Sequence, residues 1–130
     1  MLILAIRTDS PEPEIGLYDN TTQLAHITWH AHRELSATLH YKIDELLASQ
    51  RKQLKNLEAI VCYEGPGSFT SLRVGITVAD TIAYSFDLPI VAAGGEEWAA
   101  RGIARLRAGE NQHIALPLYG REARITAPKH

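Results

Sequence analysis

A short run rich in glycine and hydroxyl side chains is the part of this sequence best suited to bind an anion. The run consists, in order, of Gly65, Pro66, Gly67, Ser68, Phe69 and Thr70. Two glycines around a proline predict a tight turn between the apolar segment before the run and the helical spacing after it. A turn from a strand into a helix can hold a phosphate, because unpaired amides and the helix dipole both point into it.

The same run also has a purely structural interpretation. Ser68, Thr70 and Ser71 could cap the free N–H groups of the following helix. The run does not match G-x-x-x-x-G-K-[ST], so it is not a P-loop, and it contains no G-x-S-x-G nucleophile elbow. The residues therefore favour a structural corner with capping hydroxyls, and phosphate binding by Gly65 to Thr70 stays open as the alternative.

Histidines supply a second pattern with chemical potential. His26 and His30 have the spacing of a helical metal site, but the residues between them favour a strand. On a strand the two imidazoles would lie about 13 Å apart, too far to share one ion. His30 and His32 would share one face of that strand, but the sequence indicates no third ligand beside them. We expect neither a metal nor a cofactor.

Composition indicates a soluble globular chain. The 130 residues are 45% hydrophobic and 22% charged, which is typical of one domain. The single cysteine, Cys62, lies in an apolar run and is expected to be a small core residue. No charged-then-apolar signal peptide opens the chain, and no apolar run approaches the roughly 18–20 residues of a membrane span. We expect a cytoplasmic protein with no membrane contact.

The charge is unevenly distributed along the chain. The formal net charge of −2 argues against a dedicated nucleic-acid binder. Residues 1–100 nevertheless hold seven Lys or Arg against thirteen Asp or Glu, whereas residues 101–130 hold six against two. A basic tail could contact RNA or an acidic partner through Arg121 and Arg124, and the alternative is an ordinary solvated surface.

Apolar spacing predicts the elements that position these residues. We expect strands over 2–6, 15–18, 23–31, 57–63 and 90–92, and helices over 35–50, 71–86 and about 96–108. An antiparallel meander followed by alternating helices and strands makes an α/β fold with a mixed five-stranded sheet and about three helices. Residues 1–110 would form one lobe, and residues 111–130 an extended basic tail.

The helix after the turn carries a row of small side chains. Ser71, Gly75, Ala79 and Ala83 recur at steps of four and so stack along one face, where another helix could approach closely. Glycine inside a helix costs up to about 1 kcal/mol relative to alanine, so Gly75 indicates a packing requirement. The residues leave two partners open for this row: the first helix of the same chain, or a helix of another protein.

Several of these residues together resemble the TsaB (YeaZ) family. The run from Gly65 to Thr70, the following Leu72-Arg73-Val74-Gly75 and Ala79 match its signature. Residues 3–6, the Arg33-Glu34 pair before the first helix and residues 88–91 fit the family's order and spacing. The resemblance covers residues 1 to about 108, and residues 117–122 are similar to the family's Pro-x-Tyr-x-Arg ending.

The resemblance implies a single actin-like ATPase (RNase H-like) lobe and a role as a non-catalytic subunit. Such subunits bind TsaD, which transfers a threonylcarbamoyl group to the adenosine beside the anticodon of certain tRNAs, and a TsaE-type ATPase joins the same assembly. tRNA would be reached through the complex. The same surface could pair two copies when the protein is alone. The expected interface with TsaD consists of Leu35, Leu39, Ile43, Ser71, Gly75, Ala79 and Ala83, beside the signature residue Arg73.

Three departures from the family pattern refine this expectation. Arg7 stands where the family tends to have an acidic residue, and its positive charge could not help to hold a metal–nucleotide complex. Ser71 stands at a common glycine position. The usual second lobe is expected to be missing. A catalytic TsaD-type relative would also need a helical pair of histidines, which the sequence does not supply, so we expect no bond chemistry.

Overall fold

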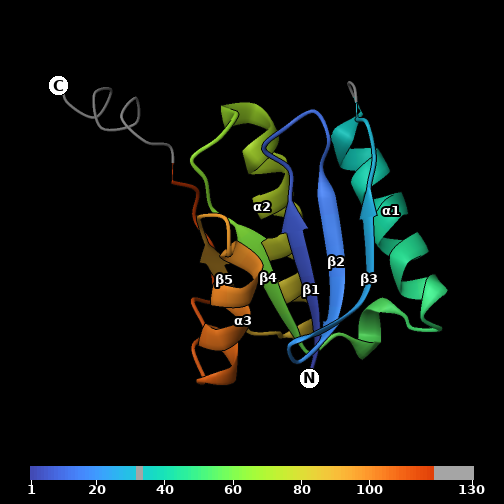
Figure 1. Ribbon diagram of the computed structural model, residues 1–130, viewed down its shortest axis with the longest axis vertical. Coiled ribbons are helices and arrows are strands. Elements are labelled where there is room, and N and C mark those ends of the chain that lie inside the picture. Colours follow the sequence, from blue (N-terminus) through green and yellow to red (C-terminus); the bar gives the residue numbers. More distant parts are fainter. Residues whose placement is uncertain (32–33, 119–130) are drawn as a thin grey trace, which may run out of the picture.

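The computed structural model describes residues 1–31 and 34–118, with the backbone alone for Phe69. It contains one five-stranded sheet with the order β3-β2-β1-β4-β5 (Figure 1). The strands are β1 (Leu2–Arg7), β2 (Glu14–Asp19), β3 (Thr22–Thr28), β4 (Ala59–Tyr63) and β5 (Ile90–Ala93). The helices are α1 (Leu35–Ser49), α2 (Phe69–Phe86) and α3 (Trp98–Arg107), with a short 3-10 turn, η1 (Leu54–Asn56).

Strand pairing confirms the predicted mixed sheet. The first three strands form an antiparallel meander, in which Ala5 of β1 pairs with Gly16 of β2. On its other side β1 runs parallel to β4, with Ala5 opposite Val61, and β4 runs parallel to β5. Because parallel strands are covered on both faces, β1, β4 and β5 are almost entirely apolar and buried.

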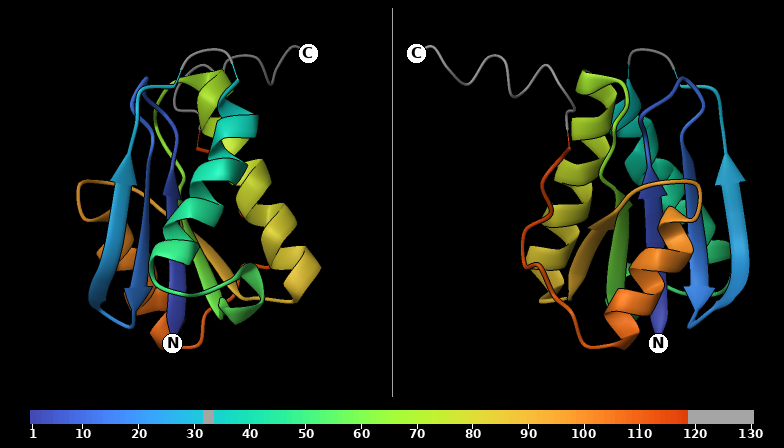
Figure 2. Two further views of the ribbon diagram at one scale, coloured as in Figure 1. Left: turned by 90° about the vertical axis from the view of Figure 1, so that its right-hand side faces the viewer. Right: turned by 60° about the vertical axis from the view of Figure 1, so that its left-hand side comes forward.

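Helices cover both faces of the sheet. α1 and α2 lie together on one face, and α3 lies on the other (Figure 2). α1 turns an apolar stripe to the core, as its spacing predicts. The buried residues of this stripe are Leu35, Leu39, Ile43, Leu46 and Leu47. On the opposite face Gly102 of α3 lies against Val61 of β4, where an added Cβ would be 2.4 Å from Val61 Cγ1.

The chain continues to pack on the lobe beyond α3. Gln112 N–H donates to the Ile90 carbonyl (2.8 Å), and Gln112 Oε1 accepts from Ala92 N (2.5 Å), so this segment borders β5. The chain then crosses α2, where Ala115 N donates to Asp80 Oδ1 (2.8 Å). Residues 111–118, predicted as the beginning of an extended tail, are therefore tied to the sheet and to α2.

Candidate functional site

The Gly-Pro-Gly corner lies at the carboxyl ends of the three parallel strands (Figure 1). It joins β4 to α2 as the sequence predicts, and Gly65 takes a left-handed backbone with φ of 107°. In open α/β sheets ligands bind at this edge. The contents of the corner therefore decide whether a phosphate fits there.

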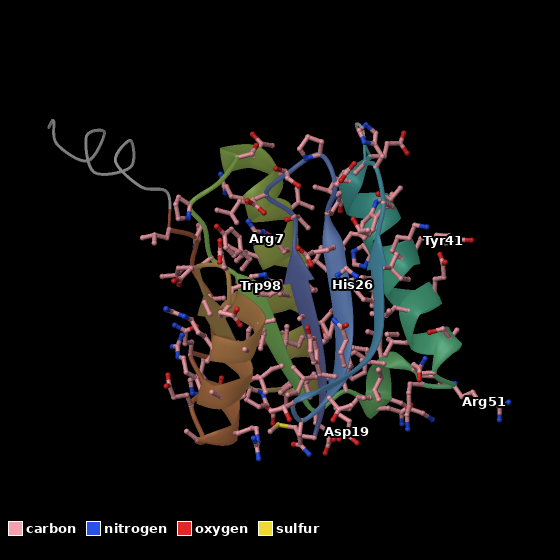
Figure 3. All side chains as sticks on the ribbon, in the orientation of Figure 1. Arg7, Asp19, His26, Tyr41, Arg51 and Trp98 are labelled. Atoms are coloured by element: carbon pink, nitrogen blue, oxygen red, sulfur yellow. The ribbon has the colours of Figure 1, made fainter. Side chains whose placement is uncertain are left out.

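Arg7 and Asp9 form an ion pair beside the corner. Arg7 Nε donates to Asp9 Oδ1 at 2.7 Å and its Nη2 to Asp9 Oδ2 at 3.3 Å. The guanidinium of Arg7, which is labelled in Figure 3, also stacks on the Tyr63 ring, 3.8 Å from its centroid. The hydrogen bond to Asp9 raises the pKa of Arg7, against the opposing effect of burial. The positive charge of Arg7 is therefore paired with a carboxylate of the same chain.

The Asp9 side chain occupies the space against the turn. A Cβ added to Gly67 would lie 2.5 Å from Asp9 Cβ and 2.7 Å from its Oδ2. The Asp9 carbonyl accepts a hydrogen bond from Ser68 N at 3.3 Å. A carboxylate near the first turn of a helix is itself favourable to the helix dipole. The corner therefore already holds a negative charge, which disfavours a phosphate.

The other side of the corner is covered by the end of the described chain. Leu118 N donates to the Glu64 carbonyl at 2.6 Å, and a Cβ on Gly65 would lie 2.5 Å from the Leu118 carbonyl oxygen. Within the turn, the Tyr63 hydroxyl donates to the Pro66 carbonyl at 2.9 Å. These contacts fix the turn as a packed junction.

The predicted capping hydroxyls act differently from the expectation. Ser68 is the N-cap of α2, but within the described residues its side chain makes no capping hydrogen bond. The N–H of Ser68 itself donates to the Asp9 carbonyl, so the backbone of the N-cap residue is bonded although its hydroxyl does not cap. Thr70 is exposed, and Ser71 lies inside the first turn of the helix. The capping prediction is therefore wrong for Ser68.

A hydroxyl from the residue that follows β1 contacts this helix. Thr8 Oγ1 donates to the Ser71 carbonyl at 2.6 Å and accepts a hydrogen bond from Gly75 N at 3.0 Å. Thr8 is buried and follows β1 directly. An added Cβ on Gly75 would lie 2.3 Å from Thr8 Oγ1. The absence of a side chain at Gly75 is therefore required for packing within its own chain. From the sequence, a helix of another protein was the alternative partner.

Five other expected interface residues are also internal, and Ser71 is half-buried. Ala79 and Ala83 are buried in the core. The same is true of Leu35, Leu39 and Ile43 on α1. A sheet face needs apolar cover, and these two helices supply it, so the predicted contact strip is used inside the lobe. This corrects the expectation that these side chains themselves touch a partner.

The outward face of α2 is a second row of residues, which we call the α2 ridge. It consists of Thr70, Arg73, Thr77, Thr81 and Tyr84, all exposed. The spacing of three and four residues places them along one side of the helix. Tyr84 is 89% exposed, an unusual state for a large ring.

Two grooves flank the α2 ridge. One, of about 320 Å³, lies toward α1 and is lined by Ser36, Val74 and Val78 beside three ridge residues. The other, of about 500 Å³, lies toward residues 114–117. Along that segment the side chains of Ile114 (64%) and Leu116 (70%) are exposed. The ridge and its borders thus form a broad surface of β-branched, aromatic and aliphatic groups.

Metal chemistry finds no support in the described part of the chain. His26 lies in β3, where its Nε2 is 2.9 Å from Glu14 Oε1. Across residues 1–31 and 34–118, no cluster of His, Cys, Asp or Glu could hold an ion, and His32 lies outside this range. Burial raises the pKa of the Cys62 thiol, as befits a core residue.

Three other expectations concern the remaining parts of the chain. Arg33, Arg121 and Arg124 lie outside the described residues. No helix in the described ranges is long and apolar enough to cross a membrane.

Sequence reasoning missed Thr8 and Asp9, although a polar pair directly after a buried strand is the usual signal of a site at the carboxyl edge of a sheet.

Comparison with known proteins places the chain in a family. A family model described as TsaD, tRNA N6-adenosine threonylcarbamoyltransferase, matches residues 27–109. The TsaB protein of Bacillus subtilis is 35% identical over 103 residues, which are 78% of this chain and 45% of the relative. The TsaB protein of Haemophilus influenzae is 30% identical over 89% of this chain and 49% of its own length. The chain spans about half the length of these relatives.

Solved structures agree in fold. YeaZ from Pseudomonas aeruginosa superposes with a TM-score of 0.67 at 25% identity, over 83% of this chain and 50% of that one. RuvC from Thermus thermophilus superposes with a TM-score of 0.52 at 14% identity, which shows the fold alone, over 87% of this chain and 82% of that one. The lobe has the RNase H-like, actin-like ATPase fold. With the Gly65–Thr70 signature at the junction of β4 and α2, the chain belongs to the TsaB (YeaZ) family.

Proposed function

We propose that this chain is a non-catalytic partner subunit in the synthesis of threonylcarbamoyladenosine in tRNA, and that it binds a TsaD-type catalytic subunit. Its TsaB relatives carry the name of this biosynthesis. The observation that carries the proposal is the α2 ridge, an exposed row on a helix that Thr8 ties to the end of β1. A rigid helix with an exposed mixed face is suited to docking on another protein.

The contact surface is the α2 ridge with its flanking grooves. The strip of Ser71, Gly75, Ala79 and Ala83 positions the helix from within and leaves the outward row for the partner. Tyr84 is the proposed anchor, because an exposed aromatic ring carries large contact area at low cost in conformational entropy. Ile114 and Leu116 would add apolar contacts at the edge.

The absence of chemistry in this subunit is part of the proposal. Arg7 is engaged by Asp9 and Tyr63, and Asp9 fills the turn, so the corner serves to aim α2. A TsaE-type ATPase and tRNA would join through the complex. Arg121 and Arg124 are candidate contacts to RNA, and neutralising both while measuring tRNA binding by the full assembly tests that part.

Co-purification of the full chain with TsaD from the same organism tests the proposal. Thr77→Glu and Tyr84→Ala each change an exposed ridge residue, so both variants should fold normally and bind TsaD at least about tenfold more weakly, as loss of a contact worth 1.4 kcal/mol would give. Thr21→Glu, in the exposed turn after β2, is the matched control and should bind like the unaltered chain. A wild-type chain that does not bind TsaD overturns the function; unaltered affinity in both ridge variants overturns the surface.

A further inference from the structure

A groove separates α3 from the hairpin of β2 and β3, on the face of the sheet opposite α1 and α2 (Figure 2). Its volume is about 410 Å³, and the small side chains of Ala100 and Ala104 line it on the side of α3. Arg7, Trp98 and His26, all labelled in Figure 3, also line it. We call this hollow the α3 groove.

Carboxylates gather at one end of the α3 groove. Glu96 and Glu97 come directly before α3, and both residues are exposed. Across residues 1–31 and 34–118, neither carboxylate has an ion-pair partner. Glu14 lines the groove too, and its Oε1 is 2.9 Å from His26 Nε2. Because the charge of Arg7 is already paired with Asp9, this end of the groove has an excess of negative charge.

The described chain ends close to these carboxylates. Leu118 N donates to the Glu64 carbonyl, and the Leu118 carbonyl lies against Gly65. Gly94 packs on the same turn, because a Cβ added to it would lie 3.0 Å from the Gly65 carbonyl oxygen. Glu96 is only two positions beyond Gly94. A short length of chain after Leu118 is therefore enough to reach the negative end of the α3 groove.

The sequence that follows Leu118 carries the opposite charge. Residues 119–130 lie outside the described residues, and they include Arg121, Arg124 and Lys129 against the single acidic residue Glu122. Arg121 comes three positions after Leu118, which is about 10 Å of extended chain. A segment joined to a site by so few residues meets it at an effective concentration on the order of millimolar, so weak contacts suffice to hold it.

We propose that residues 119–130 dock in the α3 groove, with Arg121 and Arg124 beside Glu96 and Glu97. A bidentate pair of guanidinium and carboxylate is the strongest contact available to these side chains. Arg107 lines the groove near the other end of α3. The negative end, next to the Gly-Pro-Gly corner, is therefore the end at which the basic segment enters.

The neighbouring grooves fit a basic segment less well. The groove on the other side of α3 is lined by Arg101 and Arg105, with Glu64 as its carboxylate. The two grooves beside the α2 ridge both contain Arg73. Charge and distance from Leu118 therefore select the same groove.

Docking would control when the basic segment can contact RNA. Arg121 and Arg124 are the candidate RNA contacts in the complex, and a guanidinium paired with a carboxylate of the α3 groove is not available to a phosphate. The inference does not depend on the binding of TsaD, because the α2 ridge lies on the other face of the sheet (Figure 2). It is tested with the chain alone.

Paramagnetic broadening of amide signals in the full chain gives the first test. A nitroxide attached to Ala127→Cys should broaden the signals of Ala100 and Ala104 on α3 and leave those of Thr77 and Thr81 on α2 sharp. Cys62 is buried and does not take the label. Equal broadening on both helices, or broadening on neither, overturns the proposal.

Charge variants of the labelled chain separate docking from mere proximity. Glu96→Gln with Glu97→Gln removes both carboxylates at nearly constant volume and should abolish the broadening on α3. Asp44→Asn with Asp87→Asn removes two exposed carboxylates from α1 and the end of α2, and this matched control should keep the broadening. Loss of the broadening in the control as well would contradict the proposed pairing.

A change in the segment itself covers the case in which the variant at Glu97, the N-cap of α3, does not fold. Arg121→Gln with Arg124→Gln leaves every described residue unaltered. It should also abolish the broadening on α3, because the pairing needs both charges. Broadening that persists in this variant overturns the proposal.

Discussion

Thr8 is hydrogen-bonded to Gly75 through its side-chain hydroxyl, although the two residues are 67 positions apart. The same hydroxyl donates to the Ser71 carbonyl, so it bridges two backbone groups one turn apart on α2. A group inserted at this point ties the helix to the end of β1 and sets the direction in which α2 leaves the sheet. The orientation of the α2 ridge therefore depends on Thr8.

Gly75→Ala should destabilise the fold. The new methyl would lie 2.3 Å from Thr8 Oγ1, which is closer than any real contact. Overpacking of this kind costs about 1–3 kcal/mol, opposed by alanine's better helix propensity of up to about 1 kcal/mol. Urea unfolding of the full chain measures the change in the free energy of unfolding.

Thr8→Ala tests whether the cost of Gly75→Ala comes from the steric clash with Thr8 or from a general effect of alanine in the helix. It removes the hydroxyl that the new methyl would meet, so T8A and G75A together should cost less than the sum of the two single changes. Additive costs would mean that Thr8 and Gly75 are not coupled. A bulky Gly75→Leu would abolish co-purification with TsaD, but through misfolding, since this position faces the core.

Gly102 makes the corresponding contact on the other face of the sheet. A methyl there would lie 2.4 Å from Val61 Cγ1. Gly102→Ala should lower the free energy of unfolding by about 1–3 kcal/mol, because α3 must move away from β4. Ala104→Gly, at an exposed position of the same helix, should cost at most about 1 kcal/mol from propensity alone. Equal effects in thermal unfolding would contradict the steric explanation.

Much of the fold could be predicted because the apolar periodicities are strong. The continuous apolar runs of β1 and β4 and the stripe from Leu35 to Leu47 each allow one interpretation. The Gly-Pro-Gly turn also fixes the junction of β4 with α2. These signals are local, so they survive without knowledge of the tertiary structure.

The contents of the site could not be predicted, because they depend on contacts distant in sequence. Thr8 reaches Gly75, and Leu118 reaches Glu64, across more than fifty residues each. A row of small residues is equally compatible with a partner helix and with the chain's own sheet. Only the placement of β1 beside α2 decides between them, and that placement shows Gly75 to be internal.

Asp80 gives the protein a pH dependence with a definite sign. Partial burial raises the pKa of its carboxyl, against the lowering effect of the hydrogen bond from Ala115 N. The folded protein thus holds this proton to higher pH than the unfolded chain, where the pKa is about 3.9. The contribution of Asp80 to the free energy of unfolding is therefore present in acid. It is lost as the pH rises through the pKa that Asp80 has in the folded protein.

Asp80→Asn should remove this contribution. The amide oxygen can still accept from Ala115 N, and no charge forms. We expect a higher Tm than wild type near neutral pH, and a difference that shrinks to zero as pH falls toward about 4. Thermal unfolding followed by circular dichroism over this range measures it. A difference that does not vary with pH would mean that Asp80 is solvated alike in both states.

Asp9 should decide the response of the corner to phosphate. Its carboxylate lies against Gly67 and holds Arg7, so calorimetry of the full chain with ADP or ATP should show no saturable heat. Asp9→Asn removes the negative charge and weakens the hold on Arg7, so weak binding of inorganic phosphate should then become measurable. Arg7→Met in the same background should abolish it, because the cation is gone while the hydrophobic stem remains. Saturable binding of ADP by the unaltered chain would contradict this prediction.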